Sequence, residues 1–269
     1  FHDGYVSDIY DINGEMPQGS FIVNINIIGG ASGSPIINNE EKVVGLLYGG
    51  GKTYALSLKK EFIEYAIGEI KKGKVPLRQH IGVFTELYSL DKAVKHRSFP
   101  NNLIKGYIKE FPEARNRVIS VSKILKGTCA EGVLEVGDII WQVNGKKLSA
   151  DLVLFDHLMN QAKNEIKLTI FRNGEKLEKK VKVYDLDNYI VKELFDFGVA
   201  VFFEADEFVS SKVGIKVGDP AVMFIKEGST FSVIPTFNSN NPMFYRITPL
   251  QFGNKVVKNL SDIVKLSSE

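Results

Sequence analysis

Alternating apolar and polar residues mark the first part of the chain as β structure. Residues 21–28 alternate as a half-buried strand does. A polar turn at residues 38–41 leads into a second apolar run at residues 42–48, and residues 53–58 predict a further strand. We therefore expect short strands, joined by turns, as far as about Leu58.

The spacing of apolar residues becomes helical at residues 59–72. Five apolar residues fall on one face of this segment: Phe62, Ile63, Ala66, Ile67 and Ile70. Gly73 is expected to end the helix. The same rules predict later segments, namely strands at residues 117–121 and 139–143, a helix at residues 151–159, and two strands joined at residues 172–175.

From about Tyr184 the pattern weakens. Four apolar runs are strand candidates: residues 197–203, 221–225, 231–234 and 244–247. Residues 252–264 then have the order strand, glycine-containing turn and amphipathic helix. Glu204, Asp206 and Glu207 form an acidic cluster, which a solvated loop explains better than a cation site.

Composition narrows the classes of function. A chain of 269 residues with 44% hydrophobic and 25% charged residues is typical of a globular protein of two or three domains. The formal net charge of +2 gives no electrostatic reason to expect nucleic acid or an acidic membrane surface as a partner. No apolar run approaches the roughly 20 residues of a membrane span. Cys129 is the one cysteine, so an internal disulfide is excluded, and His96 and His157 lack metal-ligand spacing.

A glycine-rich turn at residues 29–35, Gly-Gly-Ala-Ser-Gly-Ser-Pro, separates two apolar runs. Such a turn can expose the Ser32 hydroxyl on a rigid support, and its glycines allow the N–H groups of Gly30 and Ser32 to converge as an oxyanion hole does. The motif resembles the Gly-x-Ser-Gly-x-Pro nucleophile motif of chymotrypsin-fold serine proteases, which implies Ser32 as the nucleophile. The alternative is an ordinary hairpin loop that holds two serines.

The same resemblance implies a substrate-binding strand. Tyr48, Gly49 and Gly50 end one apolar run, and in such proteases this strand pairs with the substrate backbone and helps to wall the side-chain pocket. A serine nucleophile also needs a histidine base and an orienting carboxylate. The sole histidine before Ser32 is His2, which is badly placed for that role, so we expect both partners upstream of Phe1.

Residues 73–83, Gly-Lys-Val-Pro-Leu-Arg-Gln-His-Ile-Gly-Val, look like the protease-to-PDZ linker of the HtrA/Deg family of PDZ-containing serine proteases. That resemblance implies that Ile81, Gly82 and Val83 form the loop whose N–H groups bind the C-terminal carboxylate of a peptide, itself added as an extra strand. On these three residues alone, a plain linker and first strand would be the simpler interpretation.

The most specific signal is Glu-Val-Gly-Asp-Ile-Ile-Trp-Gln-Val-Asn-Gly at residues 135–145, which resembles the PDZ signature. Ile139 and Val143 are expected in the core, and Asn144 and Gly145 are expected to close a hairpin of type I′. The insert at residues 84–116 is long for a loop. Three roles are open for it: it carries helices, covers the peptide groove, or contacts a neighbouring subunit.

Together these resemblances imply a mainly β fold with some α structure, the second half of a chymotrypsin-like barrel followed by PDZ modules. The expected domains are the C-terminal protease barrel with its closing helix at residues 1–73, a PDZ domain with a long insert at residues 74–184, and a divergent PDZ-like domain at residues 185–269. Whether the last domain is complete is left open.

The family implies endoproteolysis of unfolded or damaged protein, without a metal or organic cofactor, by a trimer-based homo-oligomer. It also implies a periplasmic or otherwise exported bacterial protein, with a eukaryotic organelle as the alternative. Two rivals belong to other classes: a chaperone or binding protein on a truncated protease scaffold, and a regulatory module whose PDZ domains bind a partner.

Overall fold

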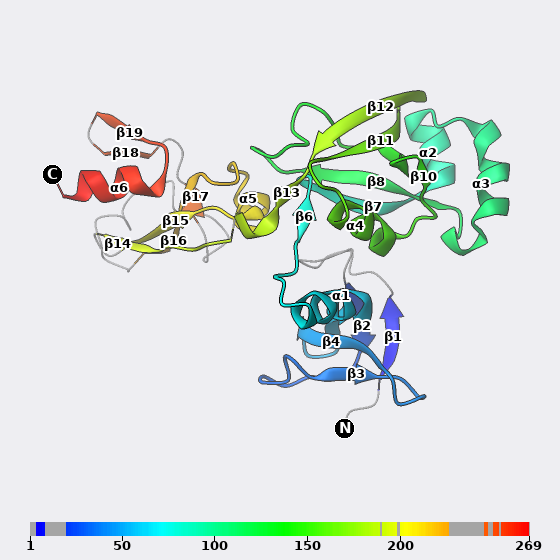
Figure 1. Cartoon of the computed structure of the whole chain (residues 1–269), viewed down its shortest axis with the longest axis horizontal. Coiled ribbons are helices and arrows are strands. Elements are labelled where there is room, and N and C mark those ends of the chain that lie inside the picture. Colours follow the sequence, from blue (N-terminus) through cyan, green and yellow to red (C-terminus); the bar gives the residue numbers. More distant parts are fainter. Residues whose placement is uncertain are drawn as a thin grey trace.

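The computed structural model describes residues 4–8, 20–188, 190–197, 200–225, 245–246, 250–252 and 254–268. Within these ranges the fold is mainly β, as the sequence pattern predicts. Strands gather in successive sheets along the chain, and helices pack beside them (Figure 1). None of the helices in the described ranges is long and apolar enough to cross a membrane.

The first sheet is antiparallel and has the strand order β1-β2-β5-β4-β3. Its strands are β1 (Tyr5–Asp8), β2 (Ser20–Asn24), β3 (Pro35–Ile37), β4 (Val43–Gly50) and β5 (Ala55–Lys59). A small core of Phe21, Val23, Leu47 and Ala55 holds the sheet together. Strand β2 ends at Asn24, so the alternation up to Ile28 predicted too long a strand.

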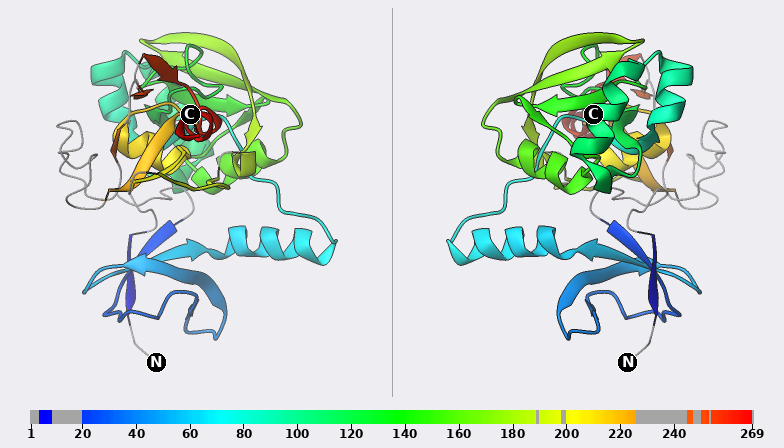
Figure 2. Two further views of the ribbon diagram at one scale, coloured as in Figure 1. Left: turned by 90° about the vertical axis from the view of Figure 1, so that its left-hand side faces the viewer. Right: turned by 90° about the vertical axis from the view of Figure 1, so that its right-hand side faces the viewer.

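Helix α1 (Lys60–Lys71) follows β5 and confirms the helical spacing. It projects away from the sheet (Figure 2), and none of its residues is buried. Ile67 and Ile70 are 46% and 63% exposed, so the far end of the predicted apolar face is open to solvent. The role of this helix in closing a barrel therefore stays a prediction.

The second sheet has the order β12-β11-β9-β8-β7, with β10 paired to β9. Its strands are β7 (Val83–Ser89), β8 (Arg117–Ile124), β9 (Ile139–Val143), β10 (Lys146–Lys147), β11 (Glu165–Arg172) and β12 (Glu175–Lys182). Helix α4 (Leu152–Asn160) packs on one face through Leu152, Phe155 and Met159. The Asp151 side chain caps this helix by accepting the N–H groups of Val153 and Leu154.

The insert after β7 carries helices and packs on the opposite face of this sheet. It contains α2 (Leu90–Arg97), η1 (Asn101–Leu103), α3 (Ile104–Glu110) and η2 (Pro112–Ala114). Phe99 lies against Trp141 and Phe171, with ring centroids 5.5 and 4.9 Å away. The insert thus builds a second hydrophobic core. Of the three roles that the sequence left open, the structure confirms the first, that the insert carries helices.

Ile139 and Val143 are both buried but lie in different cores, on opposite faces of the sheet. Their even spacing would place them on one face of a regular strand. The pairing of β9 with β11 shifts register between Ile140 and Gln142, so an irregularity at Trp141 reverses the alternation. Asn144 and Gly145 have φ angles of 51° and 80°, as the predicted type I′ turn requires.

Strand β6 (Gln79–His80) pairs with β13 (Tyr184–Asp185), so the segments that enter and leave the second sheet lie side by side. After η3 (Leu186–Asn188) comes a four-stranded sheet in the order β14-β15-β16-β17. Its strands are β14 (Phe195–Phe197), β15 (Ala200–Glu204), β16 (Pro220–Ile225) and β17 (Tyr245–Arg246), with α5 (Glu207–Val213) between β15 and β16. We call residues 195–268 the C-terminal module.

One strand prediction in the C-terminal module is wrong. Residues 197–203 do not form one strand, because Phe197 pairs with Ala200 across the hairpin of β14 and β15. The candidate at residues 231–234 lies outside the described residues. The predicted strand-turn-helix order at the end is confirmed by β18 (Leu250–Phe252), β19 (Lys255–Val257) and α6 (Leu260–Ser267).

Candidate functional site

Ser32 lies in the turn that joins β2 to β3, where it is exposed. Gly30 and Gly33 have φ angles of 93° and 90°, a region that favours glycine. The Gly33 N–H donates to the Leu47 carbonyl at 2.7 Å and fixes the turn against β4. The glycines therefore serve the turn geometry that the motif predicts, and the serine side chain remains accessible.

The N–H groups of Gly30 and Ser32 are the predicted oxyanion hole. Among the residues that the structure describes, neither group donates a hydrogen bond. A Cβ placed on Gly30 would meet no atom within 4 Å, so the outer side of the turn is open. Both donors are available to a ligand, and their catalytic role stays a prediction.

The predicted substrate strand is the end of β4. Gly49 and Gly50 pair with Leu56 and Ala55 of β5 on one edge. On the other edge, β3 pairs with β4 only between Val43 and Leu46. The second edge at the two glycines thus lacks a strand partner within the described ranges, as pairing with a substrate backbone would require.

The Ser32 hydroxyl donates to the Tyr48 carbonyl at 3.5 Å, a long and therefore weak hydrogen bond. In the described part of the chain no histidine is hydrogen-bonded to it: Nδ1 of His80 contacts Glu207, Nε2 of His157 contacts Gln161, and His96 is exposed. His2 lies outside the described residues. A base for Ser32 is therefore not part of the described site.

The second predicted site is the loop before β7. Gly82 has a φ angle of 87°, and a Cβ there would overlap the Thr128 side chain. The Gly82 carbonyl accepts the Leu125 N–H at 2.9 Å. Ile81 and Val83 are fully buried in the main core, so their side chains offer no exposed surface. The backbone, and the Gly82 N–H in particular, is what this loop can present to a ligand.

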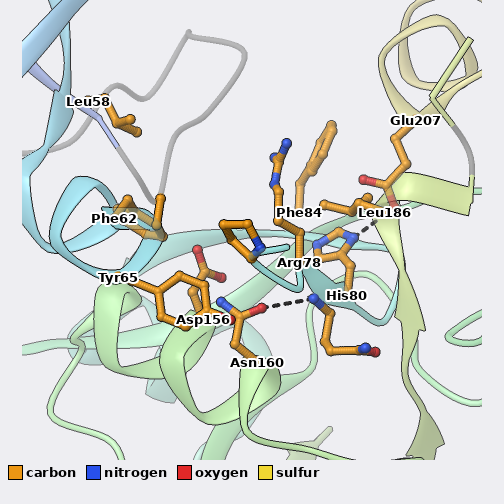
Figure 3. Close-up of a pocket in the computed structure, with 13 residues that line it drawn as sticks. Leu58, Phe62, Tyr65, Arg78, His80, Phe84, Asp156, Asn160, Leu186 and Glu207 are labelled. Carbon is orange, nitrogen blue, oxygen red and sulfur yellow. Dashed lines mark hydrogen bonds and ion pairs between the residues drawn. The ribbon is translucent and has the colours of Figure 1, made fainter. Parts of the chain in front are cut away.

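A cluster of polar side chains lies beside this loop. Nδ1 of His80 is 2.8 Å from Oε1 of Glu207, the first residue of α5 (Figure 3). The Tyr184 hydroxyl donates to the same carboxylate oxygen. The Gly82 N–H also points at Nδ1 of His80, at 3.3 Å. The C-terminal module thus reaches the predicted carboxylate-binding loop through Glu207.

Burial and neighbouring charges shift the pKa values of two groups in and beside this cluster. Burial by itself would lower the pKa of His80, but the hydrogen bond and the charge of Glu207 outweigh it and raise that pKa. Asp156 of α4 lies nearby, and its burial raises its pKa to about 6 although His80, Lys59 and Arg78 act in the opposite direction. Two groups whose pKa values are raised therefore flank the loop.

A pocket of about 410 Å³ opens at this junction. It lies between α1, α4, the start of β7 and the residues that lead into the C-terminal module (Figure 3). Phe62 and Tyr65 line it from α1, and Phe84 and Asp156 line it from the second sheet and its helix. No group of three or more His, Cys, Asp or Glu residues that could hold a metal occurs within the described ranges.

The interpretation of Glu204, Asp206 and Glu207 as a solvated loop is wrong. The Asp206 carboxylate caps α5 by accepting the Val209 N–H at 2.8 Å, and Glu207 contacts His80. The cap had a local signal, an acid directly before a helix. The His80 contact had none, because the two residues are 127 positions apart.

Two family profiles match this chain, one over the segment that carries Ser32 and one within the segment that forms the second sheet. The profile of the PDZ domain matches residues 103–171, and the profile of Peptidase S7, flavivirus NS3 serine protease, matches residues 7–62. The uncharacterized protein RP187 of Rickettsia prowazekii is 43% identical over 122 residues, which cover 45% of this chain and 63% of that protein.

Longer relatives are serine proteases. The pro-apoptotic serine protease NMA111 of Meyerozyma guilliermondii is 24% identical over 249 residues, or 89% of this chain and 24% of that protein. The corresponding protease of Aspergillus terreus is 28% identical over 163 residues, or 59% of this chain and 15% of that protein. The chain thus spans less than two thirds of each of these relatives.

Among solved structures, the HtrA-type protease AlgW with a decapeptide has a TM-score of 0.43 at 16% identity, over 68% of this chain and 55% of that one. The sequence matches carry the assignment, since a serine-protease segment precedes a PDZ domain in one chain that also matches NMA111 proteases. The chain therefore resembles the HtrA/Deg family of PDZ-containing, chymotrypsin-fold serine proteases in sequence and in the order of its domains.

Proposed function

We propose that the protein is a serine endopeptidase that cleaves unfolded or damaged proteins, and that its PDZ module binds extended peptide ends. The observation that carries the proposal is the Ser32 turn, with its exposed hydroxyl and its two free N–H donors at Gly30 and Ser32. The similarity to HtrA-type serine proteases supports the reaction class. Trimeric assembly and export to a bacterial periplasm remain predictions.

In this mechanism Ser32 attacks the scissile carbonyl, and the N–H groups of Gly30 and Ser32 stabilise the oxyanion. The substrate backbone pairs with the open edge of β4 at Gly49 and Gly50. A histidine and a carboxylate outside the described site would supply the base and its orienting partner. Hydrolysis by this route requires no metal or organic cofactor.

The test uses the natural full-length protein and a fluorophosphonate probe, which labels an activated serine. We expect labelling that is lost in Ser32→Ala and retained in Ser34→Ala, a matched change in the same exposed turn. Labelling that survives Ser32→Ala would rule out this serine as the nucleophile.

A second candidate function is peptide binding without catalysis. It is favoured by the weak 3.5 Å contact of the Ser32 hydroxyl with a carbonyl rather than with a base. A folded full-length protein that fails to react with the probe, yet binds peptides with an affinity that amidation of the peptide C-terminus abolishes, would establish this alternative. Amidation removes the carboxylate that the Gly82 N–H would bind.

A further inference from the structure

The pocket beside the Gly82 loop contains an acid that has no hydrogen-bond or ion-pair partner among the described residues. Two acids line this pocket, Asp156 and Glu207. Glu207 is satisfied, because its carboxylate accepts hydrogen bonds from His80 and Tyr184. Among the described residues, Asp156 has neither a hydrogen bond nor an ion pair within 4 Å.

The surroundings of Asp156 are largely apolar and aromatic. Phe62 and Tyr65 lie beside its carboxylate in Figure 3, and Phe84 lines the same pocket from β7. A carboxylate in such a setting loses hydration, and this burial outweighs the nearby positive charges and raises its pKa to about 6. A cation would neutralise the carboxylate, and aromatic faces attract cations.

Within the described ranges, no cation of the chain fills this role. Arg78 is exposed at the pocket mouth, and its guanidinium points away from the Asp156 carboxylate in Figure 3. His80 is directed to Glu207 instead. These positive charges, with Lys59, only moderate the pKa of Asp156. The pocket therefore has space and charge for a cation from outside.

We propose that this pocket receives the cationic side chain of a lysine or arginine at the C-terminal end of a bound peptide, with Asp156 as its counter-ion. The proposal rests on the proposed peptide-binding function, in which the Gly82 N–H binds the peptide carboxylate. The pocket adjoins that N–H, because His80 lines the pocket and faces Gly82 at 3.3 Å. Asp156 is thereby a specificity-determining residue.

The test measures peptide binding by fluorescence anisotropy, with the full-length protein carrying Ser32→Ala so that peptides stay intact. One peptide is compared with three last residues: lysine, acetyl-lysine and norleucine. We expect the lysine peptide to bind about tenfold more tightly than either neutral peptide, at about pH 7.5. Asp156→Asn should reduce this preference to about twofold or less, whereas Glu175→Gln, which removes an exposed acid outside the pocket, should leave it unchanged.

Equal binding of the three peptides would overturn the proposal while leaving peptide binding in place. A lysine preference that survives Asp156→Asn would also overturn it. Binding of none of the peptides would refute the peptide-binding function itself. Because acetyl-lysine removes the charge from the peptide, the first comparison needs no change in the protein and does not depend on how the variants fold.

Discussion

Oε1 of Glu207 lies 2.8 Å from Nδ1 of His80, so the C-terminal module contacts the residue two positions before Gly82. The same nitrogen faces the Gly82 N–H at 3.3 Å. One ring nitrogen cannot donate to a carboxylate and accept from an amide at the same time. With Nδ1 protonated, His80 donates to Glu207, and the Gly82 N–H is left for another acceptor. Protonation of Nδ1 of His80 therefore affects whether the Gly82 N–H is available to bind a peptide carboxylate.

We expect the pKa of His80 to lie above its ordinary value and to fall in Glu207→Gln. A raised pKa means that the contact stabilises the folded protein most fully below about pH 6.5, and that this stabilisation is lost as the pH rises through the raised pKa. Titration of the His80 ring by NMR measures this directly. Glu175→Gln is the control, and an unchanged pKa in Glu207→Gln would show that another group sets it.

Asp156 should make stability depend on pH in a predictable direction. Its pKa is raised to about 6, so its charged form destabilises the unliganded protein at neutral pH. Asp156→Asn should therefore raise the free energy of unfolding at about pH 7.5 and change it little at about pH 3, where the carboxyl is largely protonated in both states. Urea unfolding at the two pH values checks this, and an equal gain at both would point to packing instead of charge.

Replacing Gly82 and Gly145 distinguishes two sources of destabilisation, namely backbone strain and steric overlap of the new Cβ. Both have positive φ angles, 87° and 80°, but a Cβ would overlap Thr128 only at Gly82 and would meet open space at Gly145. Gly145→Ala should cost about 1–2 kcal/mol of unfolding free energy from backbone strain alone. Gly82→Ala should cost distinctly more. An equal loss of unfolding free energy in the two variants, measured by chemical denaturation, would show that the Thr128 side chain moves aside at little cost.

Asp138 of the PDZ signature forms a buried ion pair with Arg172 at the end of β11. Arg172 binds Asp138 through two hydrogen bonds of 2.7 Å each, and Asp138 is 1% exposed. Arg172→Met would leave a buried carboxylate without its partner, at an expected cost of about 3–5 kcal/mol. Lys180→Met breaks the exposed pair with Glu165 and should cost less than about 1 kcal/mol. Denaturant unfolding of both variants tests the difference.

The second core can be followed through Trp141, the one tryptophan of the chain. Trp141 is 7% exposed and lies against Phe99 of the insert. Phe99→Ala should shift the tryptophan emission to longer wavelength and cost about 3–5 kcal/mol, because it opens a cavity beside the indole. Phe62→Ala on α1 is the control. An unshifted emission in Phe99→Ala would mean that the insert is not what shields Trp141.

Much of the fold follows from the sequence because its signals are local. The spacing of Phe62 to Ile70 gave helix α1, the Asn144-Gly145 pair gave a tight turn, and the glycines around Ser32 gave an exposed serine. Each of these depends on residues that are neighbours in the chain. Ile139 and Val143 are buried as expected, but their division between two cores could not be predicted, because the irregularity at Trp141 depends on how β9 pairs with a distant strand.

The sequence by itself determined the order of the modules and the loops that carry Ser32 and Gly82. Only the tertiary structure decided that the insert forms a second core and that Glu207 contacts His80, 127 residues away. The physical reason is that chain periodicity encodes which residues are apolar, whereas desolvation and pairing of a charge depend on what packs against it. Asp156 is an ordinary helix residue in the sequence, and the surrounding pocket makes it an unpaired acid.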